Sequence, residues 1–221
     1  MASLVQDYVT RSGKKILVID YAISESMGNA LYEYFHRYAD WSFDENEEKN
    51  ADNVKFIHGL SNTLIESSPL WKTLDLYVRK FFGSGYTPYN CSVNHTRFGD
   101  SPLSHRDTYN AEVQDITLLL YLNPKWNMNF SGETVYFDEA GEIEFSVLPK
   151  FCRLAIHEAY IEHASRSPAQ IFTGSRYTLA IKATPDETYL QNRIMEDAPL
   201  DHVMEQRKSD LEGRIFGRLR N

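Results

Sequence analysis

A histidine and an aspartate stand two residues apart in the chain, at His105 and Asp107. In an extended segment, side chains two residues apart point to the same face. These two can therefore offer an imidazole nitrogen and a carboxylate oxygen to one metal ion. Far downstream, His163 supplies a third candidate ligand. Two histidines and one carboxylate that leave coordination positions open form the facial triad that is typical of non-haem iron sites.

From Tyr86 onward, the chain consists of short apolar runs separated by turn residues. These runs are the elements that must position the three side chains. Turn signals such as Asn123-Pro124, Ala140-Gly141 and Thr173-Gly174 divide the runs. Short strands at this spacing favour a β-sandwich or barrel. The expected strands are residues 15–21, 89–97, 115–122, 133–137, 143–147, 153–158 and 177–184.

Two helices are expected before most of these strands. The first begins after the capping residue Ser24, because apolar residues recur at three- and four-residue spacing as far as Tyr38. The second covers residues 61–82, with Pro69 near an internal start and Gly83 at its end. The acidic stretch 40–53 between the two helices reads as a solvated loop.

The tail after Pro185 is helical in character and rich in both charges. We expect residues 1–184 to form one domain and residues 185–221 to form helices. These helices either pack on the sheet or pair with a second subunit, which would give a homodimer.

Composition limits the class of protein. With 221 residues, of which 42% are hydrophobic and 13% aromatic, the chain can bury one sizeable core built from strands. Its net charge of −8 argues against nucleic acid as the main partner, because phosphate binding needs positive charge. Two distant cysteines, Cys91 and Cys152, indicate a reducing compartment. No apolar stretch approaches a membrane span, so we expect a cytoplasmic protein.

Several motifs follow one another in a characteristic order. They are His105-Arg106-Asp107, residues 117–123, Gly132-Glu133-Thr134, Val147-Leu148-Pro149, His163 and Arg176-x-Thr178. The series resembles the 2-oxoglutarate- and Fe(II)-dependent oxygenases, and most closely their prolyl-4-hydroxylase-like branch. The resemblance covers roughly residues 15–184.

The resemblance implies a mainly β fold with flanking helices, built on a double-stranded β-helix (jelly roll, cupin-like) core. It implies that His105, Asp107 and His163 bind Fe(II), with 2-oxoglutarate and O₂ as cosubstrates. Arg176 would grip the far carboxylate of 2-oxoglutarate in a two-pronged hydrogen bond, helped by the Thr178 hydroxyl. The implied reaction is hydroxylation of an unactivated C–H bond in a prolyl or other amino-acid residue of a peptide or protein, or in a free amino acid.

Two site assignments have rivals. His157, six residues before His163, is an alternative ligand, although it falls at the end of an expected strand. Lys182 is the alternative cation to Arg176, but it stands further along the strand, where we expect it to lie deeper or out of reach.

Other candidates surround the expected site. Asn94 and Tyr121 either contact 2-oxoglutarate or only line the cavity. The candidates for binding substrate are Arg97, Arg106, Tyr109 and Trp126, with Met128 and Phe130 as further loop candidates; the two arginines have solvated surface positions as the alternative.

Two other functions remain as alternatives. One is a cupin-like binding or sensor domain that holds metal or ligand without turnover. The other is a nucleic-acid demethylase, whose Asn-x-Tyr-x-Pro-Gly pattern is only partly present at residues 94–99, since Thr96 and Phe98 replace the Tyr and Pro. The carboxylate of Asp107 favours hydroxylation over halogenation, because the related halogenases lack it.

Overall fold

Two antiparallel sheets form the framework of the protein in the computed structural model, which describes residues 3–43, 56–100, 102–187 and 190. Over these residues, the larger sheet has eight strands in the order β1-β2-β9-β6-β11-β5-β4-β3, and the smaller has the order β10-β7-β8. The bounds are β1 (Ser3–Val9), β2 (Lys15–Asp20), β3 (Ser42–Phe43), β4 (Phe56–Leu60), β5 (Thr87–Thr96), β6 (Ile116–Tyr121), β7 (Thr134–Phe137), β8 (Ile143–Val147), β9 (Leu154–Glu158), β10 (His163–Ser165) and β11 (Arg176–Thr184).

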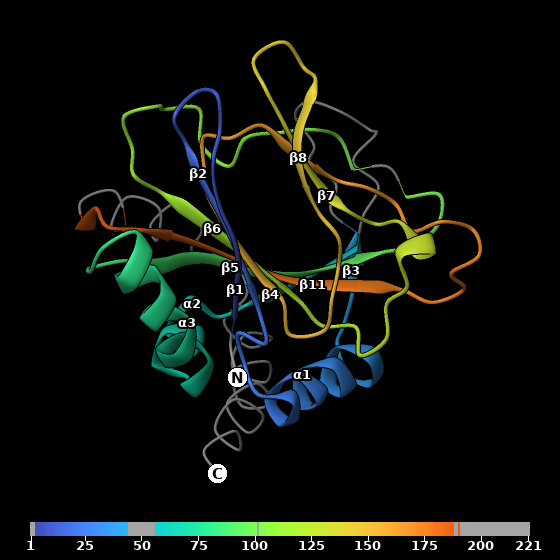
Figure 1. The fold of residues 1–221 in the computed structure, drawn as a ribbon. Helices are drawn as coiled ribbons and strands as arrows, with labels where there is room; N and C mark the ends of the chain where they lie inside the picture. The colour runs from blue at the N-terminus through green and yellow to red at the C-terminus, as the bar shows by residue number, and fades with distance from the viewer. Residues whose placement is uncertain (1–2, 44–55, 101, 188–189, 191–221) are drawn as a thin grey trace.

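The larger sheet separates the helices from the smaller sheet. Figure 1 shows α1 (Glu25–Arg37), α2 (Asn62–Ser67) and α3 (Pro69–Phe81) on one side of it, with β7 and β8 on the other. Strands that are distant in sequence are neighbours in it, such as β2 with β9 and β5 with β11. This mainly β arrangement with flanking helices is the expected jelly roll.

The two-sided burial of the larger sheet explains its apolar runs. All six residues of β6 are buried. Leu118 and Leu120 belong to the core beneath the helices, whereas Leu119 and Tyr121 belong to the core between the sheets. A strand covered on both faces reads as a continuous apolar run rather than an alternating one. The centre of the larger sheet is therefore packed on both faces.

The helices differ from expectation in one respect. Ser24 caps α1 as expected, because its side chain accepts a hydrogen bond from the Met27 N–H. The single helix expected over residues 61–82 is wrong, since α2 and α3 are separate there. Ser68 between them is extended, with φ −75° and ψ 155°. Proline disfavours helical geometry in the preceding residue and suits the first helical turn, so Pro69 ends one helix and opens the next.

Four strands were not expected: β1, β3, β4 and β10. β1 is almost entirely exposed, so no buried face marks it in the sequence. β3 falls at the start of the expected loop 40–53, and residues 44–53 lie outside the described residues. The expected tail 185–221 also lies outside them, apart from residues 185–187 and 190.

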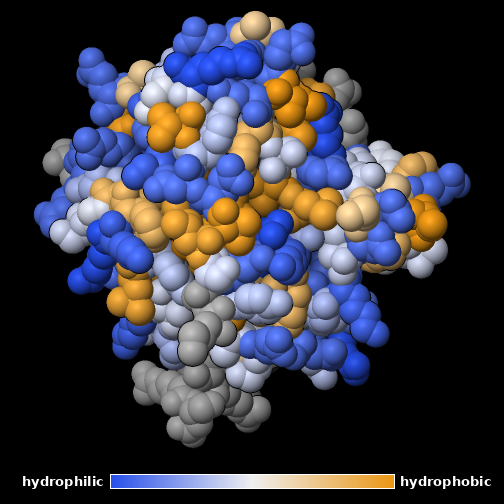
Figure 2. Space-filling view, viewed as in Figure 1, coloured by the Kyte–Doolittle hydropathy of each residue, from blue (hydrophilic) through white to orange (hydrophobic). Residues whose placement is uncertain are grey.

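The described surface mixes polar and apolar residues. Figure 2 shows hydrophilic side chains over most of one face, with apolar ones gathered mainly across its middle. Within the residues that the structure describes, no helix has both the length and the hydropathy needed to cross a membrane.

Candidate active site

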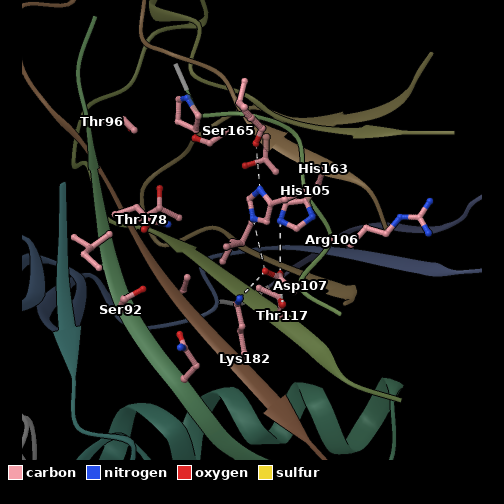
Figure 3. Close-up of a pocket in the computed structure, with 18 of the residues that line it drawn as sticks. Ser92, Thr96, His105, Arg106, Asp107, Thr117, His163, Ser165, Thr178 and Lys182 are labelled. Carbon is pink, nitrogen blue, oxygen red and sulfur yellow. Dashed lines mark hydrogen bonds and ion pairs between the residues drawn. The ribbon is translucent and has the colours of Figure 1, made fainter. Parts of the chain in front are cut away.

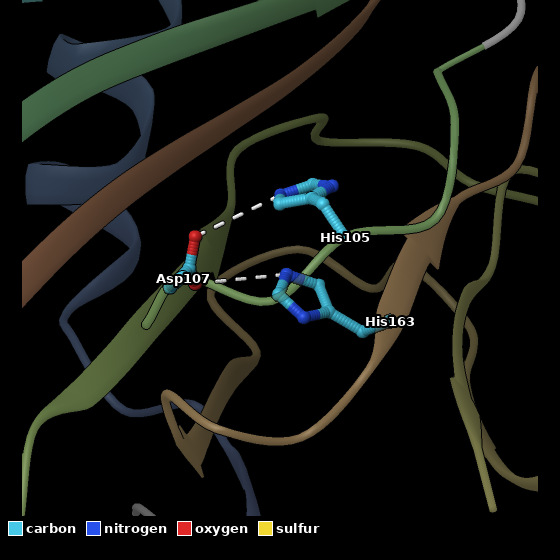
Figure 4. A group of neighbouring side chains, drawn as sticks. All are labelled: His105, Asp107 and His163. Carbon is cyan, nitrogen blue, oxygen red and sulfur yellow. Dashed lines mark ion pairs between the residues drawn. The ribbon is translucent and has the colours of Figure 1, made fainter. Parts of the chain in front are cut away.

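A pair of backbone hydrogen bonds joins the two histidines of the predicted triad. The His105 N–H donates to the His163 carbonyl and the His163 N–H donates to the His105 carbonyl, both at 2.9 Å. This isolated bridge places the His105 segment beside β10, although the segment forms no longer strand. The Asp107 N–H donates to the Ala159 carbonyl at 2.9 Å. As a result, the ligand atoms of His105, Asp107 and His163 lie within 4.8 Å of one another (Figure 4).

Both imidazoles are oriented by backbone carbonyls. Nδ1 of His105 lies 3.1 Å from the Leu103 carbonyl, and Nδ1 of His163 lies 3.0 Å from the Ile161 carbonyl. A carbonyl only accepts, so each Nδ1 carries a proton, and Nε2 is the nitrogen left to bind a metal. The Nε2 atoms of His105 and His163 lie 3.7 and 3.6 Å from carboxylate oxygens of Asp107. Burial lowers the pKa of His163 to about 4, so it is neutral near pH 7.

The carboxylate of Asp107 is buried and held from two sides. Its Oδ2 accepts a hydrogen bond of 2.6 Å from the Thr117 hydroxyl, and its Oδ1 lies 2.8 Å from the Lys182 ammonium. Burial alone raises the pKa of Asp107, but Lys182 and then the neighbouring imidazoles outweigh it and hold that pKa well below its usual range. The three residues thus offer two imidazole nitrogens and one ionised carboxylate oxygen, a donor set that fits Fe(II).

Arg176 opens β11 and is buried, with 1% of its surface exposed. Its Nη1 donates to the Ser165 hydroxyl at 2.8 Å and its Nη2 to the Thr134 hydroxyl at 3.2 Å. No carboxylate of the described residues forms an ion pair with it, and its Nε has no hydrogen-bond partner among them. Because a buried charge without a counter-ion is costly, the site is suited to receive an anion.

The triad and Arg176 share one cavity of about 700 Å³. Figure 3 shows its polar side chains converging from the strands of the larger sheet and from the His105 segment. Thr178 and Asn94, which face each other across β11 and β5, both line it. The Thr178 hydroxyl is buried and has no hydrogen-bond partner among the described residues, so it is available to a bound molecule. A cavity of this volume accommodates small-molecule ligands.

Comparison with solved structures identifies the fold. A Pseudomonas putida prolyl-4-hydroxylase has 16% sequence identity, with 76% of this chain and 91% of that chain covered and a TM-score of 0.55. A Trichoplax adhaerens prolyl hydroxylase, solved with a peptide fragment of the hypoxia inducible factor oxygen degradation domain, has 16% identity, coverage of 83% and 87%, and a TM-score of 0.56. The fold is that of the 2-oxoglutarate–Fe(II) oxygenases.

A Burkholderia pseudomallei oxidoreductase of the 2OG-Fe(II) oxygenase family shares this oxygenase fold, with 12% identity, coverage of 80% and 87%, and a TM-score of 0.57. Neither the scan against protein-family models nor the search of curated proteins found a match. At these identities the likeness concerns the oxygenase fold, and the argument for activity depends on this chain's own residues.

His157, the alternative to His163 as a metal ligand, is not part of the candidate cluster. It is fully buried, and its Nδ1 lies 3.2 Å from the Tyr136 hydroxyl. Its Nε2 lies 3.7 Å from Oδ2 of Asp107, but it is outside the cluster of candidate ligand atoms. The geometry therefore favours His163, which starts β10 after the loop that follows β9.

The other predicted site residues divide into two groups. Arg106 and Tyr109 line the cavity. Arg106 donates to Glu162 at 3.2 Å and lies 4.3 Å from the ring centre of Tyr160, while Tyr109 is 80% exposed. Tyr121 is not a lining residue, but its ring centre lies 5.4 Å from the Arg176 guanidinium carbon and supports that side chain.

Four of the predicted substrate contacts do not line this cavity: Arg97, Trp126, Met128 and Phe130. Arg97 donates to Nε2 of His95 at 3.1 Å on the other face of β5. Trp126 packs against Phe130, with ring centres 5.9 Å apart.

Lys182, expected to lie deeper or out of reach as an alternative to Arg176, lines the cavity instead, with its ammonium 2.8 Å from Oδ1 of Asp107. Ser165 and Thr134, the partners of Arg176, were not predicted. The sequence of β5 contained a pattern from which further cavity residues could have been predicted. Polar side chains alternate there with buried ones, and this period of two marks one face as polar. The residues on that face are Asn90, Ser92, Asn94 and Thr96.

Proposed function

We propose that this protein is an Fe(II)- and 2-oxoglutarate-dependent dioxygenase. It hydroxylates an unactivated C–H bond of an amino acid, either free or as a prolyl or other residue of a peptide or protein. One observation carries the proposal: a cluster of two histidines and one carboxylate shares a cavity with a buried arginine that has no described counter-ion. A site that only stored metal would not need the arginine.

Each residue has a role in this proposal. His105 and His163 hold Fe(II) through Nε2, and Asp107 holds it through its carboxylate. The bound iron, together with 2-oxoglutarate and O₂, supplies the oxidising chemistry. Arg176 binds the far carboxylate of 2-oxoglutarate, with the Thr178 hydroxyl beside it.

Other residues of the chain set which imidazole nitrogens carry protons and limit the access of water to the site. The carbonyls of Leu103 and Ile161 keep the protons of the imidazoles on Nδ1, away from the centre. Leu119 and Ala180 line the cavity with apolar side chains and reduce its water content. Asn94 projects from the neighbouring strand toward the same space, and Tyr121 holds Thr134 through a hydrogen bond of 2.8 Å. These groups orient the cosubstrate before reaction.

The amino-acid substrate class rests on the oxygenases that share the fold. Two of them are prolyl hydroxylases, and one of those was solved with a peptide fragment of a protein. A polar cavity that contains amide and hydroxyl side chains is compatible with the amide and carboxylate groups of such a substrate.

Spectroscopy and turnover test the proposal together. Anaerobic addition of Fe(II) and 2-oxoglutarate is expected to give a weak metal-to-ligand charge-transfer band in the visible, and O₂ is then expected to release succinate. Asp107→Ala removes both signals, whereas Asp7→Ala, at an exposed position of β1, keeps them. Full succinate release by Asp107→Ala would contradict the ligand assignment. A wild-type protein that binds Fe(II) and 2-oxoglutarate but releases no succinate would instead be a binding domain.

A further inference from the structure

The cavity continues beyond the triad, away from Arg176. Arg176 and Lys182 stand six residues apart on β11 and both line the cavity. At about 3.3 Å per residue in a strand, their backbones are roughly 20 Å apart. Figure 3 places Ser165, the partner of Arg176, on one side of the triad and Lys182 on the other. A five-carbon diacid bound at Arg176 therefore leaves the Lys182 end free for a second molecule.

The end of the cavity around Lys182 is lined mainly by small side chains, most of them polar. In the sheet register Lys182 pairs with Asn90 on β5 and with Thr117 on β6, and Ala180 pairs with Ser92. All of these residues line the cavity. Amide and hydroxyl groups donate to anions and carbonyls as well as accept from ammonium groups. The Lys182 end of the cavity can therefore bind a carboxylate and the polar groups of a substrate next to that carboxylate.

Aromatic surface is scarce in the cavity. Apart from the imidazoles, the one aromatic side chain among the described lining residues is Tyr109, which is 80% exposed. Enzymes that act on an extruded nucleobase stack it between aromatic or apolar side chains. The Lys182 end is accordingly better suited to an aliphatic polar molecule than to a base.

With a divalent metal and 2-oxoglutarate bound, the charges of the cavity would sum to one positive charge. Among the described lining residues the cations are Arg106, Arg176 and Lys182, and the carboxylate is Asp107. Arg106 pairs with Glu162 outside the triad. A divalent metal and Arg176 carry three positive charges, which 2-oxoglutarate and Asp107 offset with three negative ones. Lys182 pairs with Asp107, but one carboxylate cannot offset both this ammonium and the metal, so one positive charge remains uncompensated at this end.

We propose that Lys182, with Asn90 and Ser92, binds a carboxylate of the substrate. The substrate is then an amino acid with a free carboxylate, either a free amino acid or the C-terminal residue of a peptide, rather than an internal residue. The inference rests on the proposed function. Since Lys182 Nζ lies 2.8 Å from Asp107 Oδ1, a carboxylate on this ammonium lies next to the triad, with the carbons attached to it nearby.

The test uses Lys182→Met, Lys182→Arg and Ser92→Ala, with Lys72→Met on the exposed face of α3 as the matched control. Binding of Mn(II) and of 2-oxoglutarate is measured first, anaerobically, by calorimetry. The second probes are the twenty protein L-amino acids, their carboxamides, the glycyl dipeptides that end in each, and the N-acetyl amides. They are titrated into the Mn(II)–2-oxoglutarate complex and assayed for succinate release with Fe(II).

At least one acid is expected to bind at least tenfold more tightly than its amide. Lys182→Met weakens that binding tenfold or more, Lys182→Arg restores part of it, and Ser92→Ala weakens it a few-fold. Lys72→Met does not change it. The free amino acids and the dipeptides show whether the carboxylate belongs to a free amino acid or to a C-terminus.

Three results would overturn the subsite: an amide that binds as well as its acid, unchanged acid binding in Lys182→Met, or no acid that binds at all. Failure of the proposed function looks different. In that case the wild-type protein binds neither Mn(II) nor 2-oxoglutarate in the first step, and no succinate forms.

Discussion

The Thr117 hydroxyl donates a hydrogen bond of 2.6 Å to Oδ2 of Asp107. Thr117 belongs to β6 in the centre of the larger sheet, whereas Asp107 follows β5 in an irregular segment. The rigid sheet therefore fixes the rotation of a carboxylate whose own backbone is held mainly by the loop at Ala159. Outer partners of this kind orient metal ligands and strengthen binding.

Thr117→Val tests this relationship, because valine keeps the shape of threonine and removes the hydroxyl. Loss of an outer-shell partner is expected to weaken metal binding by roughly tenfold or more. Titration of the metal-free protein with Mn(II) measures the effect, and Thr73→Val on α3 serves as the control. Equal affinity in Thr117→Val and wild type would show that Asp107 is oriented without this hydrogen bond.

Arg176→Met is expected to weaken 2-oxoglutarate binding by roughly 100-fold, since two charge-assisted hydrogen bonds to a carboxylate are lost. Metal affinity in the absence of 2-oxoglutarate is expected to stay the same. Thermal unfolding is expected to show no loss of stability, because the substitution also removes a buried charge that has no described counter-ion. A large drop in melting temperature with unchanged 2-oxoglutarate affinity would assign Arg176 a structural role.

The two buried histidines near Asp107 are distinguished by substitution. His163→Ala is expected to abolish metal binding, because it removes a nitrogen of the candidate cluster. His157→Gln is expected to reduce metal affinity by no more than about tenfold, as it alters only a neighbour of Asp107. Mn(II) titration with circular dichroism as the folding control measures both. The reverse order of the two effects would make His157 the ligand.

A third histidine, His95, predicts how stability depends on pH. It is 4% exposed on the other face of β5, where its Nε2 lies 2.6 Å from the Ser175 hydroxyl and accepts from Arg97. Burial, and then the charges of Arg97 and His36, lower the pKa of His95 from 6.5 to about 4. The unfolded chain therefore binds a proton at a higher pH than the folded protein does.

The contribution of His95 to the free energy of unfolding is fully present above about pH 6.5 and is lost as the pH falls toward 4. The expected loss is on the order of 2 kcal/mol. Urea denaturation of the metal-free protein between pH 7.5 and 4.5 measures it. His95→Gln is expected to flatten the curve without levelling it, since the pKa of His163 is also lowered to about 4. An unchanged slope in His95→Gln would refute the assignment.

The sequence by itself determined the class of fold and predicted the candidate metal ligands. Apolar and alternating runs predicted seven strands of the larger and smaller sheets, because a face packed against the core excludes most polar residues. The order of His105, Asp107, His163 and Arg176 predicted the group that the fold assembles. Residue type limits which side chains can bind a metal or a carboxylate, so these candidates could be predicted without a tertiary structure.

Only the tertiary structure decided how the groups meet. The bridge between His105 and His163 joins residues 58 apart in sequence, and a local pattern does not encode such pairing. The place of Lys182 also depends on register, since its pairing with Thr117 and Asn90 brings its ammonium to Asp107. The division of α2 from α3 and the short strand β10 depend on packing around them. Position along the chain sets the order of the ligands, but strand pairing sets their distances.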